Sequence, residues 1–285
     1  MNTVSRLSRQ AKPTVIEITS PQGWPRLDLI EVWRHLPIIF ILALRDIKVR
    51  YKQSLVGVGW VITQPLITVF IFTAIFGRIF ELPSGDGTPY ALLAMCGLAP
   101  WLYFILVVNT TTSCLVANQE LITRVYFPRL ALPVSCTISG LLDFMIAFVL
   151  LLIMLVHFDQ GLTARVLLLP FFVLFCMVSV FSLGLWLSAL NVQYRDVFHA
   201  LPFLTILLML ISPVAYPSSI IPDKWQWAYA LNPLATVING FRWVFLEGQP
   251  APGYYSLISV AIVSVALVGG LYFFRWQEDR FADVV

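Results

Sequence analysis

Long apolar stretches constrain the fold of this chain more than any other feature. An α-helix needs about 20 mainly apolar residues to cross the hydrocarbon core of a bilayer. Hydrophobic residues make up 59% of the 285 residues and charged residues only 12%, whereas a soluble domain carries about 25% charged residues. The stretches do not show the polar–apolar alternation of membrane β-barrel strands. The sequence therefore predicts an all-α integral membrane protein.

Six membrane spans are predicted. They cover residues 55–79, 89–116, 131–157, 166–190, 199–216 and 254–274. The fifth is the shortest and contains Pro202 and Pro213, so we expect it to be kinked or broken. Residues 1–25 form a polar tail without the apolar core of a signal peptide. The membrane domain is expected to cover residues 26–275, and a short cytoplasmic tail follows at 276–285.

The segment 224–248 is apolar enough to suggest a seventh span. It is interrupted by Asn232-Pro233 and by Asn239-Gly240, and each pair is typical of a turn or a helix break. Broken backbone inside a bilayer needs cover from protein or from a water-filled cavity, because lipid offers no hydrogen bonds. We therefore expect two short re-entrant helices that enter the outer leaflet.

The distribution of Lys and Arg predicts the orientation of the chain. With a cytoplasmic N-terminus and six spans, nine of the 18 Lys and Arg residues lie in the cytoplasmic segment 1–54. The outer segments contain only Arg78, Arg165, Lys224 and Arg242. Because cytoplasmic loops carry the excess of basic residues, both termini are expected in the cytoplasm.

The region before the first span is predicted to lie on the membrane surface. A helix over residues 26–39 would have charged residues on one side and, on the other, Leu27, Ile30, Trp33 and Leu36, as interfacial helices do. Farther on, Arg45, Lys48 and Lys52 share one helical face, where they can contact anionic headgroups or an acidic partner. An anchor that obeys the positive-inside rule explains the same charges.

The loop NQELITRVYFPRLALP, residues 118–133, predicts a small amphipathic helix on the cytoplasmic side. Asn118 can cap its start, Glu120 and Arg124 have the spacing of a helical ion pair, and Pro128 ends it. Its apolar side consists of Leu121, Ile122, Val125, Tyr126 and Phe127. An ordinary basic loop is the alternative interpretation.

The sequence shows no chemical machinery for an energy source. It contains no GxxxxGK[ST] loop, which excludes the usual ATP-binding site. The three histidines are scattered and the four cysteines lie far apart in apolar segments, so neither a catalytic nor a metal site is predicted. Asp143 lies inside the third predicted span, and we expect it to bond a neighbouring helix or face a wet cavity rather than relay protons. A transport subunit driven by a separate motor is favoured.

Six stretches occur in order between about residue 30 and the C-terminus: LRDIKVRYKQSLVGVGWVITQPLITVFIFTAIFGRIF, NQELITRVYFPRLALP, WLSALNVQYRDVFHALPFL, ISPVAYP, ALNPLATVINGFRW and FADVV. Together they resemble the permease subunits of ABC polysaccharide exporters, which export lipopolysaccharide O-antigen, capsule or teichoic acid. The resemblance implies a bacterial inner-membrane permease with six spans, an interfacial helix, a cytoplasmic coupling helix and a re-entrant helix pair between spans five and six.

The same resemblance implies the partners. Two permeases form a homodimer and bind two cytoplasmic ATPase subunits, which hold ATP and Mg, so this chain itself needs no cofactor. The implied cargo is a polysaccharide linked to undecaprenyl diphosphate, which passes through a channel at the dimer interface. Membrane lipids surround the assembly, and no nucleic acid is expected.

Four sets of residues become candidates for these roles. The ATPase-coupling set is Asn118, Glu120, Leu121, Ile122, Arg124, Val125, Tyr126 and Phe127. Aromatic rings can pack on sugars but also collect on lipid-facing surfaces, and the candidates for the glycan channel are Phe72, Phe76, Phe80, Trp101, Tyr103 and Phe104. The diphosphate or headgroup set is Arg45, Lys48, Arg50 and Lys52. The outer-gate set is Trp225, Trp227, Asn232, Pro233, Asn239, Gly240 and Arg242.

Three alternatives remain open at the level of sequence. An ABC permease for a drug or another lipid would share the architecture and differ only in cargo. A membrane enzyme of glycan assembly should show clustered carboxylates or histidines at one membrane face, and the sequence shows none. A proton-coupled flippase would depend on Asp143 alone.

Overall fold

The computed structural model describes residues 29–52, 58–83, 88–161 and 163–284. All regular secondary structure of these residues is helical. The predicted polar tail at 1–25 lies outside the described residues. Five helical stretches are long and apolar enough to cross a membrane: Gly59–Ile79, Tyr90–Ala117, Ala131–His157, Ala164–Gln193 and Ser256–Glu278. The prediction of an all-α, multi-pass membrane protein is therefore confirmed.

Each of these stretches corresponds to a predicted span. The first consists of α3 (Val58–Phe72) and a π-helical continuation, η1 (Thr73–Ile79). The second and third are α4 (Tyr90–Ala117) and α6 (Ala131–His157). The fourth joins a short 3₁₀ turn, η2 (Ala164–Leu168), to α7 (Leu169–Gln193), and the last belongs to α11 (Ser256–Val284).

The fifth predicted span is a short helix, α8 (Asp196–Ile211), of 16 residues. At 1.5 Å per residue it is about 24 Å long, less than the roughly 30 Å of a hydrocarbon core. Pro213 explains where it ends, because a proline disfavours helical conformation in the residue before it. The predicted span at 199–216 is thus interrupted before Pro213, whereas Pro202 lies inside the continuous helix α8.

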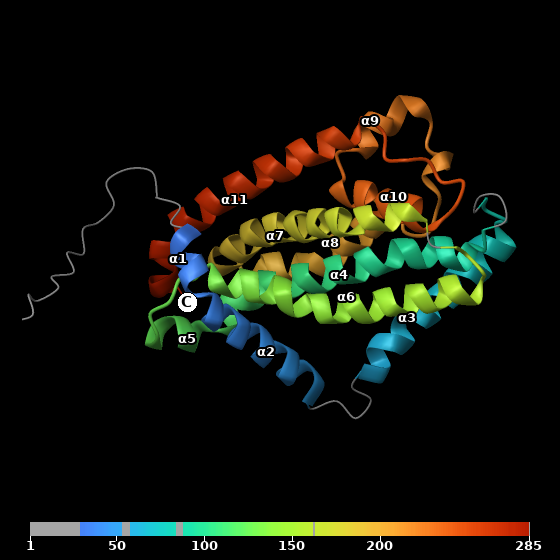
Figure 1. Cartoon of the computed structure of the whole chain (residues 1–285). Coiled ribbons are helices and arrows are strands. Elements are labelled where there is room, and N and C mark those ends of the chain that lie inside the picture. The colour runs from blue at the N-terminus through green and yellow to red at the C-terminus, as the bar shows by residue number, and fades with distance from the viewer. Residues whose placement is uncertain (1–28, 53–57, 84–87, 162, 285) are drawn as a thin grey trace, which may run out of the picture.

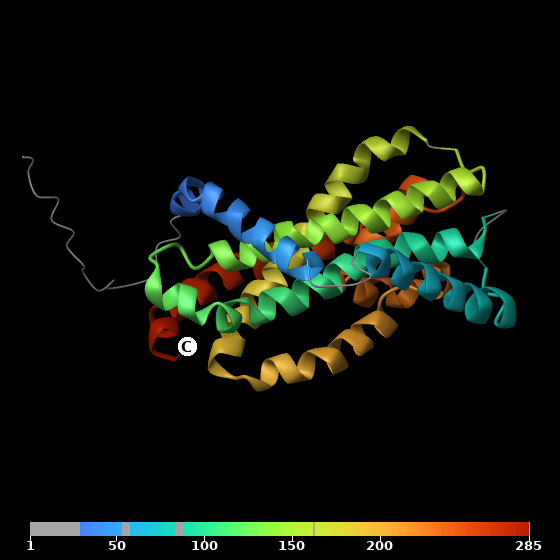
Figure 2. The same ribbon diagram turned by 90° about the horizontal axis from the view of Figure 1, so that it is seen from below.

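Helix α4 forms the centre of the bundle. Its 28 residues include no charged side chain, and it is the most buried of the five long stretches, as expected of a helix that is apolar on all sides. It packs against α6 on one side and α7 on the other, and α7 packs in turn against α11 (Figures 1 and 2). Gly184 of α7 permits close approach, because a Cβ atom there would lie 2.7 Å from the Thr111 side chain of α4.

The region before the first span consists of two helices, α1 (Leu29–Arg34) and α2 (Leu36–Lys52). The prediction of one helix over 26–39 is therefore wrong, because the chain turns at His35 and the second helix runs on to Lys52; residues 26–28 lie outside the described residues. Helix α2 packs along α6. Its buried face consists of Ile39, Leu42 and Ala43.

The segment 224–248 contains two helices, as predicted. A 3₁₀ turn, η4 (Asp223–Trp225), leads into α9 (Gln226–Tyr229), and α10 (Pro233–Phe245) follows. Asn232 caps α10, since its side-chain oxygen accepts a hydrogen bond from the Leu234 backbone nitrogen at 3.1 Å. The second predicted break is wrong, because Asn239-Gly240 lies inside α10.

The two ends of the bundle carry different elements (Figure 1). Helix α1, the small helix α5 (Gln119–Arg124) and the last turns of α11 lie together at one end, and α9 and α10 lie toward the other. Helix α11 continues to Val284, so the residues predicted as a short cytoplasmic tail at 276–285 are helical as far as Val284.

Candidate functional site

Helix α5 presents a small exposed surface at one end of the bundle. Glu120 and Arg124 are highly exposed and form a loose ion pair at 3.8 Å. Val125 and Tyr126 follow directly, and Tyr126 is 91% exposed. A large aromatic side chain in this position is suited to burial in a partner protein, because Tyr contributes strongly to interfaces.

The rest of the apolar side of α5 faces the permease. Ile122 is 9% exposed and Phe127 is 6% exposed, and both pack in a cluster with Leu115 of α4 and Phe274 of α11. Leu121 is half-buried against the same cluster. The prediction that Ile122 and Phe127 contact an ATPase is therefore wrong. Their hydrophobicity serves to seat α5 on its own bundle.

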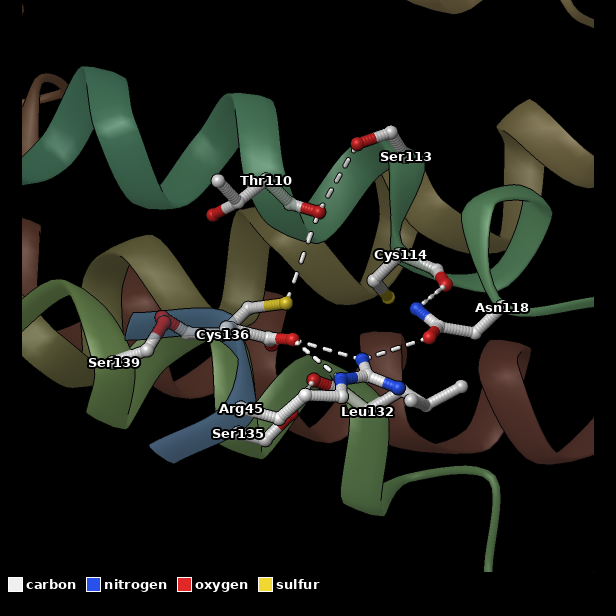
Figure 3. A network of polar contacts seen from close by, with 10 residues as sticks. Arg45, Thr110, Ser113, Cys114, Asn118, Leu132, Ser135, Cys136 and Ser139 are labelled. Atoms are coloured by element: carbon white, nitrogen blue, oxygen red, sulfur yellow. Dashed lines mark hydrogen bonds and ion pairs between the residues drawn. The ribbon is translucent and has the colours of Figure 1, made fainter. Parts of the chain in front are cut away.

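Asn118 does not cap α5 with its side chain, which corrects the sequence-based prediction. Its amide nitrogen donates to the Cys114 carbonyl at 2.8 Å, and its oxygen accepts from Arg45 at 2.8 Å (Figure 3). The side chain therefore connects the end of α4 with α2. No sequence signal pointed to this pairing, since Arg45 and Asn118 are 73 positions apart.

The chain after α5 is held by the end of α11. Arg129 contacts Glu278 through its backbone nitrogen and its guanidinium group. Glu278 also accepts a hydrogen bond from Arg275 at 2.8 Å. A cavity of about 260 Å³ lies between these three residues and the segment that includes Val125 and Tyr126. The segment that follows α5 is thus fixed to the end of α11 by these contacts.

The four residues of the predicted headgroup set divide into two pairs. Arg45 and Arg50 bond within the chain, whereas Lys48 and Lys52 are exposed. The exposed side of α2 lines a groove of about 520 Å³, formed by Ile41, Leu44, Arg45, Lys48, Val49 and Lys52. Two ammonium groups beside aliphatic side chains suit a ligand with an anionic head and an apolar tail.

Asp143 lies at a junction between α2 and α6. Its carboxylate accepts hydrogen bonds from Arg50 and from Tyr51. It also lines a cavity of about 290 Å³, to which Gln64 of α3 and Asn109 of α4 contribute polar groups. The carboxylate is thus paired with a cation rather than isolated in the apolar layer, which reduces the cost of burying it.

The predicted channel aromatics fall into two groups. Trp101, Tyr103 and Phe104 are buried in the core around α4, so the prediction that they line a channel is wrong. The others form a row along the end of α3 and η1. The ring centroids of Phe72 and Phe76 are 5.8 Å apart, and those of Phe76 and Phe80 are 6.0 Å apart.

Arg242, a member of the predicted outer-gate set, is deeply buried although it carries a charge. It is 2% exposed. Its guanidinium group donates to the carbonyls of Leu93, Val214 and Tyr216, at distances between 2.9 and 3.4 Å. It therefore fastens α10 to α4 and to the chain that follows α8. Trp225, on the 3₁₀ turn η4, is more than half exposed.

Other members of this set bond the same region together. Asn232 donates to the Ser212 hydroxyl at 2.8 Å, and Pro233 occupies the first turn of α10. The Ser218 hydroxyl donates to Asn239. Trp227, like Trp225, is exposed. The polar members thus bond to the chain between α8 and α10, whereas the two tryptophans remain on the surface.

Gly240 is required for this arrangement, and substitution by alanine tests it. A Cβ atom at Gly240 would lie 2.2 Å from the Phe172 ring of α7, so either this ring or α10 would have to shift. We expect Gly240→Ala to lower the free energy of unfolding by about 1–3 kcal/mol. Thermal unfolding of the purified protein measures the effect. Gly161 has no atom within 4 Å of such a Cβ, so Gly161→Ala is the control and should leave stability nearly unchanged.

Comparison with known proteins decides the family. The family model described as ABC-2 type transporter matches residues 38–246, which is most of the chain. The chain belongs to the ABC-2 type transporter family. The predicted resemblance is thereby confirmed, and the matched range includes α5 and the exposed basic face of α2.

The most informative relatives are named for polysaccharide export. The chain is 27% identical over 260 residues to the O-antigen export system permease protein RfbA of Myxococcus xanthus, covering 90% of this chain and 98% of that protein. It is 27% identical over 251 residues to an RfbA of Klebsiella pneumoniae, covering 87% and 95%. Over 245 residues it is 27% identical to the polysialic acid transport protein KpsM of Escherichia coli, covering 84% and 92%.

This ABC-2 permease is not itself the ATPase of its transporter. Members of the family lack a nucleotide-binding domain, and membership implies an ATPase partner. The prediction of a permease without its own nucleotide site is confirmed. The chain is related to exporters of O-antigen and polysialic acid.

Proposed function

We propose that this permease exports a polysaccharide linked to undecaprenyl diphosphate across the bacterial inner membrane, with lipopolysaccharide O-antigen as the foremost cargo. Two copies form a homodimer around the glycan path, and two ATPase subunits bind at the cytoplasmic end. Each ATPase holds ATP and Mg. The membrane domain covers residues 26–275, and both termini face the cytoplasm.

The exposed face of α2 is the observation that carries this proposal. Lys48 and Lys52 lie beside Ile41, Leu44 and Val49 in one groove. A lipid diphosphate has the matching chemistry, because its phosphates bind ammonium groups and its polyprenyl chain packs on aliphatic side chains. The groove belongs to a helix that packs on α6 near the end occupied by α5.

The remaining elements take the roles that the family resemblance suggests. Helix α5 acts as the coupling helix through Glu120, Arg124, Val125 and Tyr126, all exposed. Motor closure moves α5 as a rigid element and so shifts the spans attached to it. The row of Phe72, Phe76 and Phe80 offers ring faces to the sliding glycan. Helices α9 and α10 act as the re-entrant pair, and α8 crosses as the fifth of six spans although it is short.

Two alternative functions, a drug exporter and a proton-coupled flippase, receive less support. A drug exporter does not need the two ammonium groups of the α2 groove, and the relatives are named for O-antigen and polysialic acid. A proton-coupled flippase needs a carboxylate that titrates during transport. Asp143 is instead held between α2 and α6 by its bonds to Arg50 and Tyr51.

Reconstitution with the motor subunit tests the proposal. Proteoliposomes that contain both subunits should move a labelled undecaprenyl-diphosphate glycan when ATP is added, while the permease alone should hydrolyse no ATP. Replacing Lys48 and Lys52 by Gln should weaken cargo binding by about 2 kcal/mol, roughly thirtyfold, because each basic residue near an anionic headgroup contributes about 1 kcal/mol.

Lys224→Gln is the matched control, since Lys224 is an exposed lysine on the 3₁₀ turn before α9. It should leave cargo binding unchanged. Equal transport of a glycan that lacks the lipid diphosphate would contradict the proposed cargo. If the variant with both Lys48 and Lys52 replaced bound cargo as tightly as the original protein, the proposed binding face would be contradicted.

A further inference from the structure

One hydrogen-bonded joint connects α2 with the start of α5 (Figure 3). The Nη2 atom of Arg45 donates to Oδ1 of Asn118 at 2.8 Å. The Nδ2 atom of the same asparagine donates to the Cys114 carbonyl in the last turn of α4, also at 2.8 Å. Asn118 is the residue between α4 and α5. Arg45 is therefore bonded directly to the residue that joins α4 to α5.

The guanidinium group of Arg45 is oriented by its neighbour. Asp46 accepts from Nε at 3.1 Å and from Nη2 at 2.8 Å. Two bonds to one carboxylate oxygen restrict the planar guanidinium more than a single contact would. The side chains of Arg45 and Asp46 are also partly buried, at 40% and 25% exposure. The joint is thus more constrained than a typical solvent-exposed ion pair, in which both side chains move freely.

Helix α2 is attached to the bundle at several points. Ile39, Leu42 and Ala43 are buried, and Arg50 pairs with Asp143 of α6 one to two turns beyond Arg45. Lys48 and Lys52 remain exposed on this helix. A ligand on the exposed face therefore acts on a helix whose other contacts lead to α5 and α6.

We propose that Arg45 is a positioning residue that transmits cargo binding from α2 to α5 through Asn118. This inference rests on the proposed function, because it takes the lipid diphosphate as the ligand of Lys48 and Lys52. Arg45 acts through Asn118 rather than as a main phosphate ligand. When cargo shifts α2, the joint carries the shift to α5 and hence to the motor. By thermodynamic linkage, nucleotide binding at the motor then changes the affinity of the α2 face for cargo by the same factor, and we expect the joint to carry this change to α2.

The first test measures ATP hydrolysis by the complete permease–motor complex in nanodiscs, with and without undecaprenyl-diphosphate glycan. Asn118→Ala, which lies outside the α2 groove, should keep basal hydrolysis, and both Asn118→Ala and Arg45→Gln should reduce its stimulation by cargo about fivefold or more, the range of typical allosteric coupling. The double variant should lose no more stimulation than the more impaired of the two single variants, because each substitution breaks the same joint. Asn118→Asp keeps the oxygen that accepts from Arg45 but loses the bond from Nδ2 to the Cys114 carbonyl, so it should retain more stimulation than Asn118→Ala.

Arg34→Gln is the control, because Arg34 is an exposed cation in the same N-terminal region. It should leave stimulation unchanged. A purely structural role of Arg45 would lower basal hydrolysis and the yield of complex together. That result, or stimulation at the original level in Arg45→Gln, would overturn the inference. Absence of stimulation in the original protein would instead contradict the proposed cargo.

The second test needs no cargo, so it tests the joint between Arg45 and Asn118 independently of the proposed cargo. All four native cysteines are buried, so a spin label can be attached selectively at the exposed position of Val49→Cys on α2. Adding ATP and vanadate to the complex should change the spectrum of this label. The change should disappear when Arg45→Gln is added and persist with Arg34→Gln. If the spectral change persisted in the Arg45→Gln protein, the proposed role of the joint would be overturned even if the proposed cargo is correct.

Discussion

Arg242→Met is expected to lower the free energy of unfolding by about 2–4 kcal/mol. The side chain is 2% exposed and donates to three backbone carbonyls. Methionine fills much of the same volume but offers no donor. Each buried carbonyl that loses its partner costs about 1–3 kcal/mol. The cost falls below the full sum because Leu93 lies inside α4, where its carbonyl can retain a helical hydrogen bond.

Thermal unfolding of detergent-purified protein measures this loss. Arg165→Met is the matched control, because Arg165 also bonds the α10 region, through the Trp243 carbonyl at 3.2 Å, but is only partly buried. We expect that control to change stability by less than about 1 kcal/mol. Equal melting temperatures for the two variants would show that the carbonyl bonds of Arg242 do not fasten α10.

Tyr126→Asp is expected to abolish most export while leaving the permease folded. Tyr126 is 91% exposed, so the substitution should change permease stability by no more than about 0.5 kcal/mol. A tyrosine buried at the centre of a protein interface contributes about 2 kcal/mol or more. Loss of that contact, together with a buried carboxylate, should weaken motor binding at least thirtyfold. Co-purification with the motor and export in cells measure the two effects.

Two further variants make the result specific. Arg124→Glu reverses an exposed charge, creates a mildly repulsive pair with Glu120 on the same helix, and should also weaken motor binding. Tyr254→Asp changes another largely exposed tyrosine just before α11, near the opposite end of the bundle, and should leave binding unchanged. Normal export by both α5 variants would mean that this helix is only a linker. Leu121 is unsuitable for this purpose, because it packs against the bundle.

Membership of the membrane class and most span boundaries could be predicted from the sequence alone. The reason is physical, since a bilayer imposes a length of about 20 apolar residues whatever the helix packs against. Thus 131–157 was predicted and α6 covers Ala131–His157. The break before α10 was predictable because Asn232-Pro233 combines a capping side chain with a proline suited to the first helical turn.

Only the tertiary structure decided which side chains of these elements are available for function. Five apolar residues of the loop at 118–133 look alike in sequence, yet Phe127 packs on its own bundle and Tyr126 does not. Asn239-Gly240 has the pattern of a break but stays helical, because α10 packs tightly on Phe172. Trp101 was a candidate for the channel and lies in the core instead.

The same holds for the charged residues of α2. In the sequence Arg45 and Arg50 look like members of one basic cluster with Lys48 and Lys52. Their partners, Asn118 and Asp143, lie 73 and 93 positions away, and no local pattern encodes a contact over such a separation. Local composition therefore determined which segments are long and apolar enough to span a membrane. Helix packing, which brings distant residues together, decided which of its charges hold the fold and which can meet a ligand.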